Sequence, residues 1–88
     1  MNPTKAENLT IQDVGDEVLV HEVDSGKVHV LNEVAGYILK RCDGTHSADA
    51  IARALASETG ADIGIVGPDV DKILSEFVSL GLLLPQVS

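Results

Sequence analysis

Three amphipathic segments between Leu31 and Leu83 each lie between residues that favour a helix start and a glycine that favours a helix end. The starts are at Asn32, at Ser47 and at Gly67-Pro68-Asp69, and the ends are at Gly44, Gly60 and Gly81. Asn and Ser side chains cap the first free amides of a helix, proline fits the first turn, and glycine suits the left-handed residue after the last turn. Apolar residues recur at helical spacing inside each segment. The pattern predicts three short helices that share one core.

The region before Asn32 has the alternation of strands instead of the helical period. Residues 9–14 predict a short first strand, and the β-branched runs at residues 17–23 and 27–31 predict a hairpin. Between these runs, Asp24-Ser25-Gly26 predicts a three-residue turn with Gly26 in the left-handed conformation. A turn of that length would place His21 opposite His29.

Strands followed by helices predict an α+β fold. We expect a winged-helix-like domain in which a three-stranded antiparallel sheet is followed by a three-helix bundle. The predicted boundaries are a flexible N-terminus over residues 1–8, a single domain over residues 9–84 and a C-terminal tail over residues 85–88. The core must be aliphatic, because Tyr37 and Phe77 are the only aromatic residues of the 88.

Net charge restricts the partners that this chain can take. The chain carries −8 at pH 7, and its six Lys and Arg residues are scattered singly or as one pair. A phosphate backbone would be repelled, so we expect no nucleic-acid partner. No apolar run approaches the ~20 residues of a membrane helix, so we also expect no membrane partner. The lone cysteine, Cys42, allows no intrachain disulfide and fits the cytoplasm.

The side chains that could carry chemistry have simpler structural interpretations. Cys42 lies on the apolar face of the first helical segment and precedes Asp43, whose charge disfavours a thiolate, so we expect a core residue. His21 and His29 are too few for a zinc site with four ligands, which favours an ordinary cross-strand pair. No residues form a nucleophile, a base and an oxyanion hole. We therefore expect a protein without catalytic activity, metal or cofactor.

The third predicted strand is a candidate binding site, because it would expose unpaired backbone groups if it lies at the edge of the sheet. Its residues are Lys27, Val28, His29, Val30 and Leu31. An extended peptide can add to such an edge as a further strand. The third helix would then line the groove with Ile73, Phe77 and Leu80, with Lys72 and Glu76 at the rim. The alternative is that Ile73 and Phe77 belong to the core.

The chain resembles the PqqD-like family of peptide-binding domains, which are also called RiPP recognition elements. The resemblance covers roughly residues 17–84 and rests on motifs that occur in the same order. These are Leu31-Asn32, Ala35-Gly36, Ile38-Leu39, Cys42-Asp43-Gly44, Ile51 with Leu55, Asp69-Val70 and Gly81-Leu82-Leu83. The resemblance implies a winged-helix-like fold in which the third strand and third helix hold the leader of a ribosomally made precursor peptide. It also implies presentation of that peptide to a modifying enzyme, often a radical S-adenosylmethionine protein.

Two alternatives from other classes remain open at this point. One is a winged-helix transcription regulator, and the other is a scaffold domain for protein–protein interaction. Charge separates the first alternative from a peptide adaptor, because Arg53 and Lys72 are the only cations on the predicted second and third helices. The sequence does not distinguish a scaffold domain from a peptide adaptor.

Overall fold

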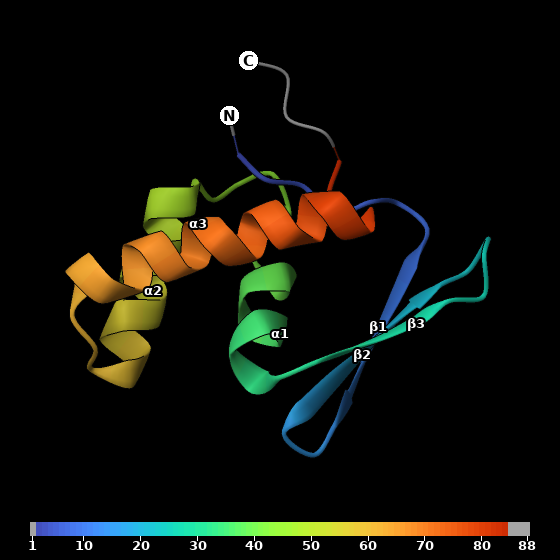
Figure 1. Ribbon diagram of the computed structural model, residues 1–88, viewed down its shortest axis with the longest axis horizontal. Helices are drawn as coiled ribbons and strands as arrows, with labels where there is room; N and C mark the ends of the chain where they lie inside the picture. The colour runs from blue at the N-terminus through green and yellow to red at the C-terminus, as the bar shows by residue number, and fades with distance from the viewer. Residues whose placement is uncertain (1, 85–88) are drawn as a thin grey trace.

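The computed structural model describes residues 2–84, so the predicted tail at residues 85–88 lies outside the described residues. A three-stranded antiparallel sheet comes first, followed by three helices, which confirms the predicted fold class (Figure 1). The strands are β1 (Leu9–Val14), β2 (Glu17–Glu22) and β3 (Val28–Leu31), in the order β1-β2-β3. The helices are α1 (Glu33–Lys40), α2 (Ala48–Thr59) and α3 (Ile63–Leu80).

The β2–β3 hairpin differs from its predicted register by one residue. The backbone N–H of Glu22 donates to the carbonyl of Lys27 at 2.8 Å, so the turn contains four residues instead of three. His21 therefore faces Val28, and His29 faces Val20. The predicted opposition of His21 and His29 is wrong because Val23 belongs to the turn. The two imidazoles consequently point to opposite faces of the sheet.

The first two helices begin at the predicted caps. The side chain of Asn32 accepts a hydrogen bond from Ala35 N at 2.8 Å, and Ser47 Oγ accepts one from Ala50 N at 3.0 Å. Gly60 ends α2 in the left-handed conformation, with φ 74°. Each of these hydrogen bonds satisfies a backbone donor that the helix itself leaves unpaired.

The third helix starts before the position that Pro68 predicts. Its N-cap is Asp62, whose Oδ1 accepts a hydrogen bond from Gly64 N at 2.8 Å, and Pro68 lies inside the helix. Proline is unfavourable there partly because its ring clashes with the Cβ of the preceding residue. Gly67 has no Cβ, and this removes that clash. Residues 63–66, which lie between the predicted helix end at Gly60 and the predicted start at Gly67, thus form the first turns of α3.

We expect Asp62→Ala to lower the free energy of unfolding by about 1 kcal/mol, since it removes the N-cap of α3. Urea denaturation followed by circular dichroism would measure the change. The matched control is Asp71→Ala, which removes an exposed carboxylate from the same helix without removing a cap. Equal stabilities of the two variants would contradict the capping role of Asp62.

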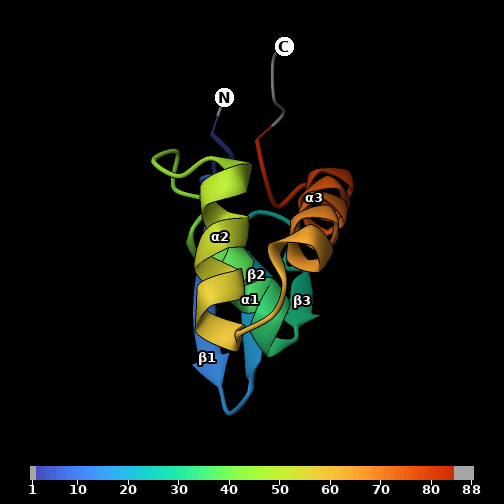
Figure 2. The same ribbon diagram turned by 90° about the vertical axis from the view of Figure 1, so that its left-hand side faces the viewer.

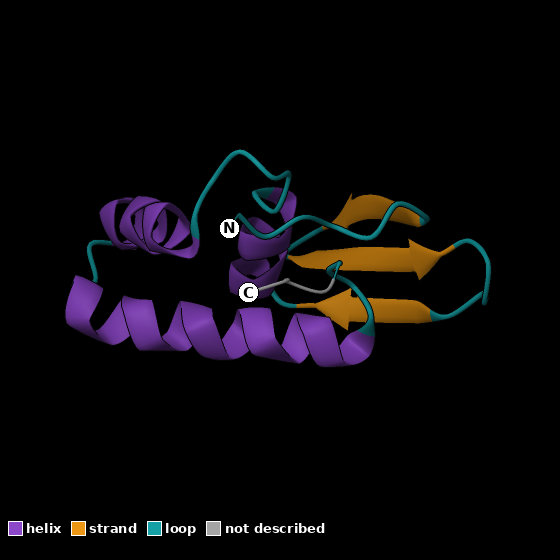
Figure 3. Ribbon diagram, turned by 90° about the horizontal axis from the view of Figure 1, so that it is seen from above, coloured by secondary structure: helices purple, strands orange, loops and turns teal. Residues whose placement is uncertain are grey.

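A single aliphatic core lies between one face of the sheet and the three helices. Its fully buried members include Val20 from β2, Ile38 and Leu39 from α1, Ile51 from α2 and Val70 from α3. Figure 2 shows α1 between α2 and α3, and Figure 3 shows that α2 lies beyond the end of the strands and not over them. Of the three helices, α1 packs directly against β2 and β3 on one face of the sheet, and the other face, which carries Val28 and Val30, stays exposed.

The segment before β1 makes contacts that the sequence pattern does not predict. Lys5 N donates to the carbonyl of Cys42 at 2.7 Å, and Ala6 N donates to the carbonyl of Leu82 at 3.0 Å. Within the segment predicted to be a flexible N-terminus, these hydrogen bonds join Lys5 and Ala6 to the end of α1 and to the chain after α3. No helix within residues 2–84 is long and apolar enough to cross a membrane.

Candidate functional site

The outer edge of β3 has no neighbouring strand within the described part of the chain. Residues facing each other in an antiparallel pair alternate between hydrogen-bonded and non-hydrogen-bonded pairs. Glu22 and Lys27 form a hydrogen-bonded pair, and so, by alternation, do Val20 with His29 and Val18 with Leu31. The backbone groups of the two intervening residues, Val28 and Val30, consequently point away from β2. These two residues offer an incoming chain two donors and two acceptors.

The side chains of β3 alternate between the two faces of the sheet. Val28 and Val30 are 56% and 57% exposed on the face that no helix covers. His29 and Leu31 point toward the helices, and Leu31 is only 8% exposed. Of the strand residues expected to hold a peptide, Leu31 therefore belongs to the core, and Val28 and Val30 supply the open backbone groups.

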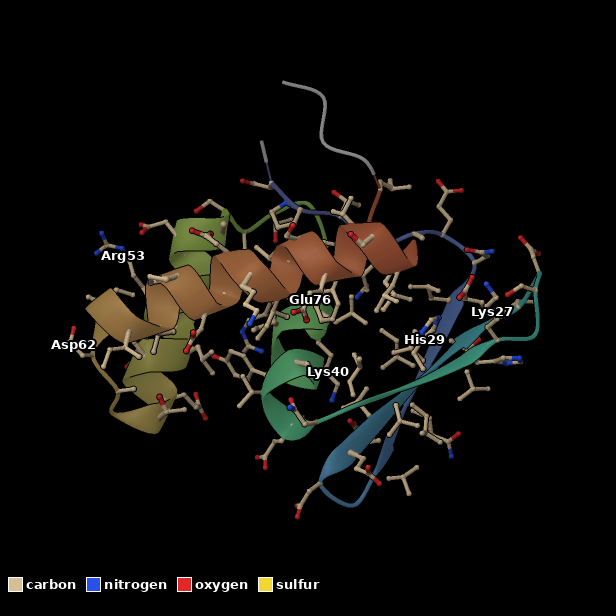
Figure 4. All side chains as sticks on the ribbon, viewed as in Figure 1. Lys27, His29, Lys40, Arg53, Asp62 and Glu76 are labelled. Atoms are coloured by element: carbon tan, nitrogen blue, oxygen red, sulfur yellow. The ribbon has the colours of Figure 1, made fainter. Side chains whose placement is uncertain are left out.

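His29 forms a hydrogen bond with Glu22 on the helix-facing side of β3. Its Nε2 lies 2.5 Å from Glu22 Oε2, and only 18% of each side chain is exposed. The hydrogen bond from His29 lowers the pKa of Glu22, and the other carboxylate oxygen accepts a weaker hydrogen bond from Ser25 Oγ at 3.3 Å. Because Glu22 is ionised at neutral pH, it anchors the imidazole at the hairpin end of the strand. Lys27, the only cation of the predicted strand, lies beyond it (Figure 4).

Helix α3 lies beyond the free edge of β3 when the molecule is viewed from above (Figure 3). It also lies above the plane of the sheet (Figure 1), and its Cα atoms stay more than 8 Å from those of β3. Neighbouring strands in a sheet are ~4.8 Å apart. A strand added to β3 would therefore run beneath α3.

The side chains predicted to line the groove on α3 divide into two groups. Lys72, Glu76 and Leu80 are exposed, Leu80 by 50%, and Ile73 is partly buried against the core. Phe77 is only 3% exposed, so the prediction that it lines the groove requires correction. It shares its helical face with the buried Val70, seven residues earlier, and that face points into the core.

A cavity of about 400 Å³ opens beyond the α1 end of β3. Its apolar walls come from three helices and are formed by Val34, Leu55, Ile65, Val66, Val70 and Ile73. Asp69, Lys72 and Glu76 bring charge to it from α3. Glu76 projects from α3 toward α1 (Figure 4). The cavity thus places an apolar hollow against the side of α3 that carries Asp69, Lys72 and Glu76.

Sequence reasoning missed most of this cavity. Val34 lies in the first amphipathic segment, yet it is 41% exposed, and Ile65 precedes the helix start predicted at Gly67 but is 65% exposed on the first turns of α3. The sequence feature that could have indicated the cavity is the pair of isoleucines, Ile63 and Ile65, which lie outside every predicted helix and strand. Exposed branched aliphatic side chains beside an apolar hollow indicate a binding surface.

The side chains considered for other chemistry have structural roles. Cys42 is fully buried, its Sγ donates to the carbonyl of Ile38 at 3.2 Å, and burial raises its pKa to about 11. This confirms its assignment to the core. No group of three or more His, Cys, Asp or Glu side chains within residues 2–84 is arranged to hold a metal ion.

Comparisons with known proteins agree with this geometry. The family model for coenzyme PQQ synthesis protein D (PqqD) matches residues 17–83. Among solved structures, "TbiB1 in Complex with the TbiA(beta) Leader Peptide" is similar with a TM-score of 0.83 and 19% identity, over 97% of this chain and 99% of that chain. "Lasso peptide synthetase B1 complexed with the leader peptide" has a TM-score of 0.84 and 20% identity, over 97% and 100%. At these identities the likeness establishes the fold alone. No curated protein matches the chain in sequence.

Proposed function

The chain belongs to the PqqD family, and from that premise we propose that it is an adaptor for a ribosomally synthesised precursor peptide. It binds the leader of that peptide by strand addition and presents it to a modifying enzyme in the cytoplasm. The observation that carries the proposal is the pair of outward-facing residues, Val28 and Val30, on an open strand edge, together with the apolar cavity between the three helices. Both similar solved structures are of proteins in complex with a leader peptide.

The adaptor function divides recognition between backbone and side chains. Hydrogen bonds to Val28 and Val30 hold an extended chain whatever its sequence, and pockets beside the strand select its side chains. The space beneath α3 accepts alternate side chains of the added strand, next to His29, Leu80 and Ile73. A large apolar side chain then enters the cavity between Val34 and Ile65. The protein itself needs no cofactor for this role, and the enzyme that it serves is often a radical S-adenosylmethionine protein in this family.

The function is tested by adding candidate short peptides, encoded beside the gene, to ¹⁵N-labelled protein and following the amide shifts. We expect the true precursor leader to shift the amides of β3 and of the α3 residues that border the cavity. The outer β1 edge serves as the internal control, because its amides should change little. Absence of shifts with every neighbouring peptide, in a sample with dispersed amide signals, would contradict the adaptor function.

We expect Ile65→Ser to weaken leader binding about five- to tenfold with little change in stability. The side chain is 65% exposed in the free protein, and a bound apolar residue would cover it, which is worth about 1 kcal/mol or slightly more. Isothermal titration calorimetry with the leader found by NMR would measure the change.

The matched control for that variant is Ile63→Ser. Ile63 is 44% exposed on the same turn of α3 but does not line the cavity. Equal losses of affinity in Ile63→Ser and Ile65→Ser would show that the cavity is not the site of the apolar anchor.

A further inference from the structure

The stripe of α3 that borders the cavity carries three charged side chains. Asp69, Lys72 and Glu76 are separated by three and four residues, so they lie on one face of the helix. All three are exposed, and none takes part in an ion pair of the described chain, where the paired carboxylates are Glu22, Asp13, Asp43 and Asp49. Two carboxylates and one ammonium group therefore line the cavity without an ion-pair partner among the described residues.

The surroundings of this stripe add to its negative charge. Residues 47–84 carry six carboxylates and only two cations, Arg53 and Lys72. Arg53 is already paired with Asp49, its Nε lying 2.7 Å from Oδ2. The apolar walls of the cavity also reduce solvent screening nearby, which strengthens the field that a ligand meets. An anionic segment would be repelled from this end of the groove.

We propose that the leader segment beneath α3 carries a lysine or arginine beside its apolar anchor, and that Asp69 and Glu76 select this cation. The inference rests on the proposed function and names the chemical class of its ligand. Asp69 and Glu76 are ~10.5 Å apart along the helix, the length of about three residues of extended peptide. A cation between them lies within reach of both carboxylates. Lys72 occupies the same interval and opposes that cation.

This arrangement predicts opposite effects for the two signs of charge. Asp69→Asn with Glu76→Gln should weaken binding of a cationic peptide about five- to tenfold at low salt, as expected for the loss of two exposed ion pairs. Lys72→Gln should strengthen the same binding about two- to threefold, because it removes the opposing charge while keeping most of the side chain. Both effects should shrink as the salt concentration rises.

A displayed library of random peptides supplies the probe. About 12 residues suffice, since an 18-residue helix is ~27 Å long and an extended chain advances ~3.3 Å per residue. The full chain is the bait, and the selected peptides are measured by fluorescence anisotropy. The matched control is Glu58→Gln with Asp71→Asn, which changes the net charge equally on exposed residues outside the cavity.

The inference is supported if the selected peptides are enriched in Lys or Arg next to a large apolar residue. The enrichment must also fall in the Asp69→Asn, Glu76→Gln variant and not in the control variant. If both pairs of variants select peptides of the same charge as the unaltered protein does, the inference is overturned and strand addition stands. If the folded protein enriches no peptide at all, the inference fails together with the proposed function.

Discussion

Val30→Pro should reduce affinity for the leader about 30- to 100-fold and leave the fold intact. The N–H of Val30 points away from β2, so proline at this position removes a donor from the open edge and no bond from the β2–β3 ladder. The ring also blocks the close approach that neighbouring backbone bonds require. A loss of about 2–3 kcal/mol from two to three main-chain hydrogen bonds gives this factor. Calorimetry measures it, and circular dichroism verifies the fold.

Two further variants make this result specific to the edge. Val30→Thr keeps the donor and the branched shape, so it should bind nearly as well as the unaltered protein. His29→Pro removes a donor that points toward β2, and it should lower the stability of the protein as a whole. A folded Val30→Pro protein that binds the leader with undiminished affinity would rule out strand addition.

The parts of the fold that sequence predicts are those specified by local contacts. Asn32 and Ser47 cap the helices that follow them through hydrogen bonds spanning three residues, so their function is visible in a short stretch of chain. The hairpin register is different, because a three- and a four-residue turn fit the same strands. The closing bond between Glu22 and Lys27 decides between them. A difference of one residue decides whether Val28 or His29 offers its backbone to a ligand.

Helix α3 starts at Ile63, before the proline that gives the stronger local signal for a helix start. Pro68 normally marks a helix start, but Gly67 before it allows the helix to continue through the proline. The earlier start of α3 matters for the candidate site. The residues before Pro68 include Ile65 and Val66, which form one wall of the cavity, and a linker carries no defined wall.

Tertiary packing decides which apolar side chains of α3 remain available. Phe77 and Ile73 are four residues apart on adjoining faces of the helix, and both fit an apolar stripe. Packing in the shared core buries the first and leaves the second partly accessible. The cavity likewise takes Val34, Leu55 and Ile65 from three helices, so no local pattern contains it.

Gly36→Ala should lower the free energy of unfolding by about 2–3 kcal/mol, although alanine has a higher helix propensity than glycine. Gly36 is buried where α1 crosses β2, and a Cβ at this position would overlap Val18 Cγ2 and lie 2.9 Å from Val18 Cβ. Val18 is 5% exposed and lies in a strand, so neither partner can yield without moving backbone. Urea denaturation of the variant measures the cost.

The double variant with Val18→Ala separates overlap from any other effect of the substitution. Val18→Ala alone should cost about 1–3 kcal/mol by leaving a cavity. Combined with Gly36→Ala, it removes the overlap with Val18 Cγ2 and leaves only the closer approach of the two Cβ atoms, so the double variant should be more stable than the two losses predict by at least about 1 kcal/mol. Val34 lies in the first turn of α1 and lines the cavity, so a displacement of α1 would also displace Val34. Leader affinity should therefore fall in the folded Gly36→Ala protein and recover in the double variant. If the two losses of stability simply add, Gly36 does not pack against Val18, and α1 lies elsewhere on the sheet.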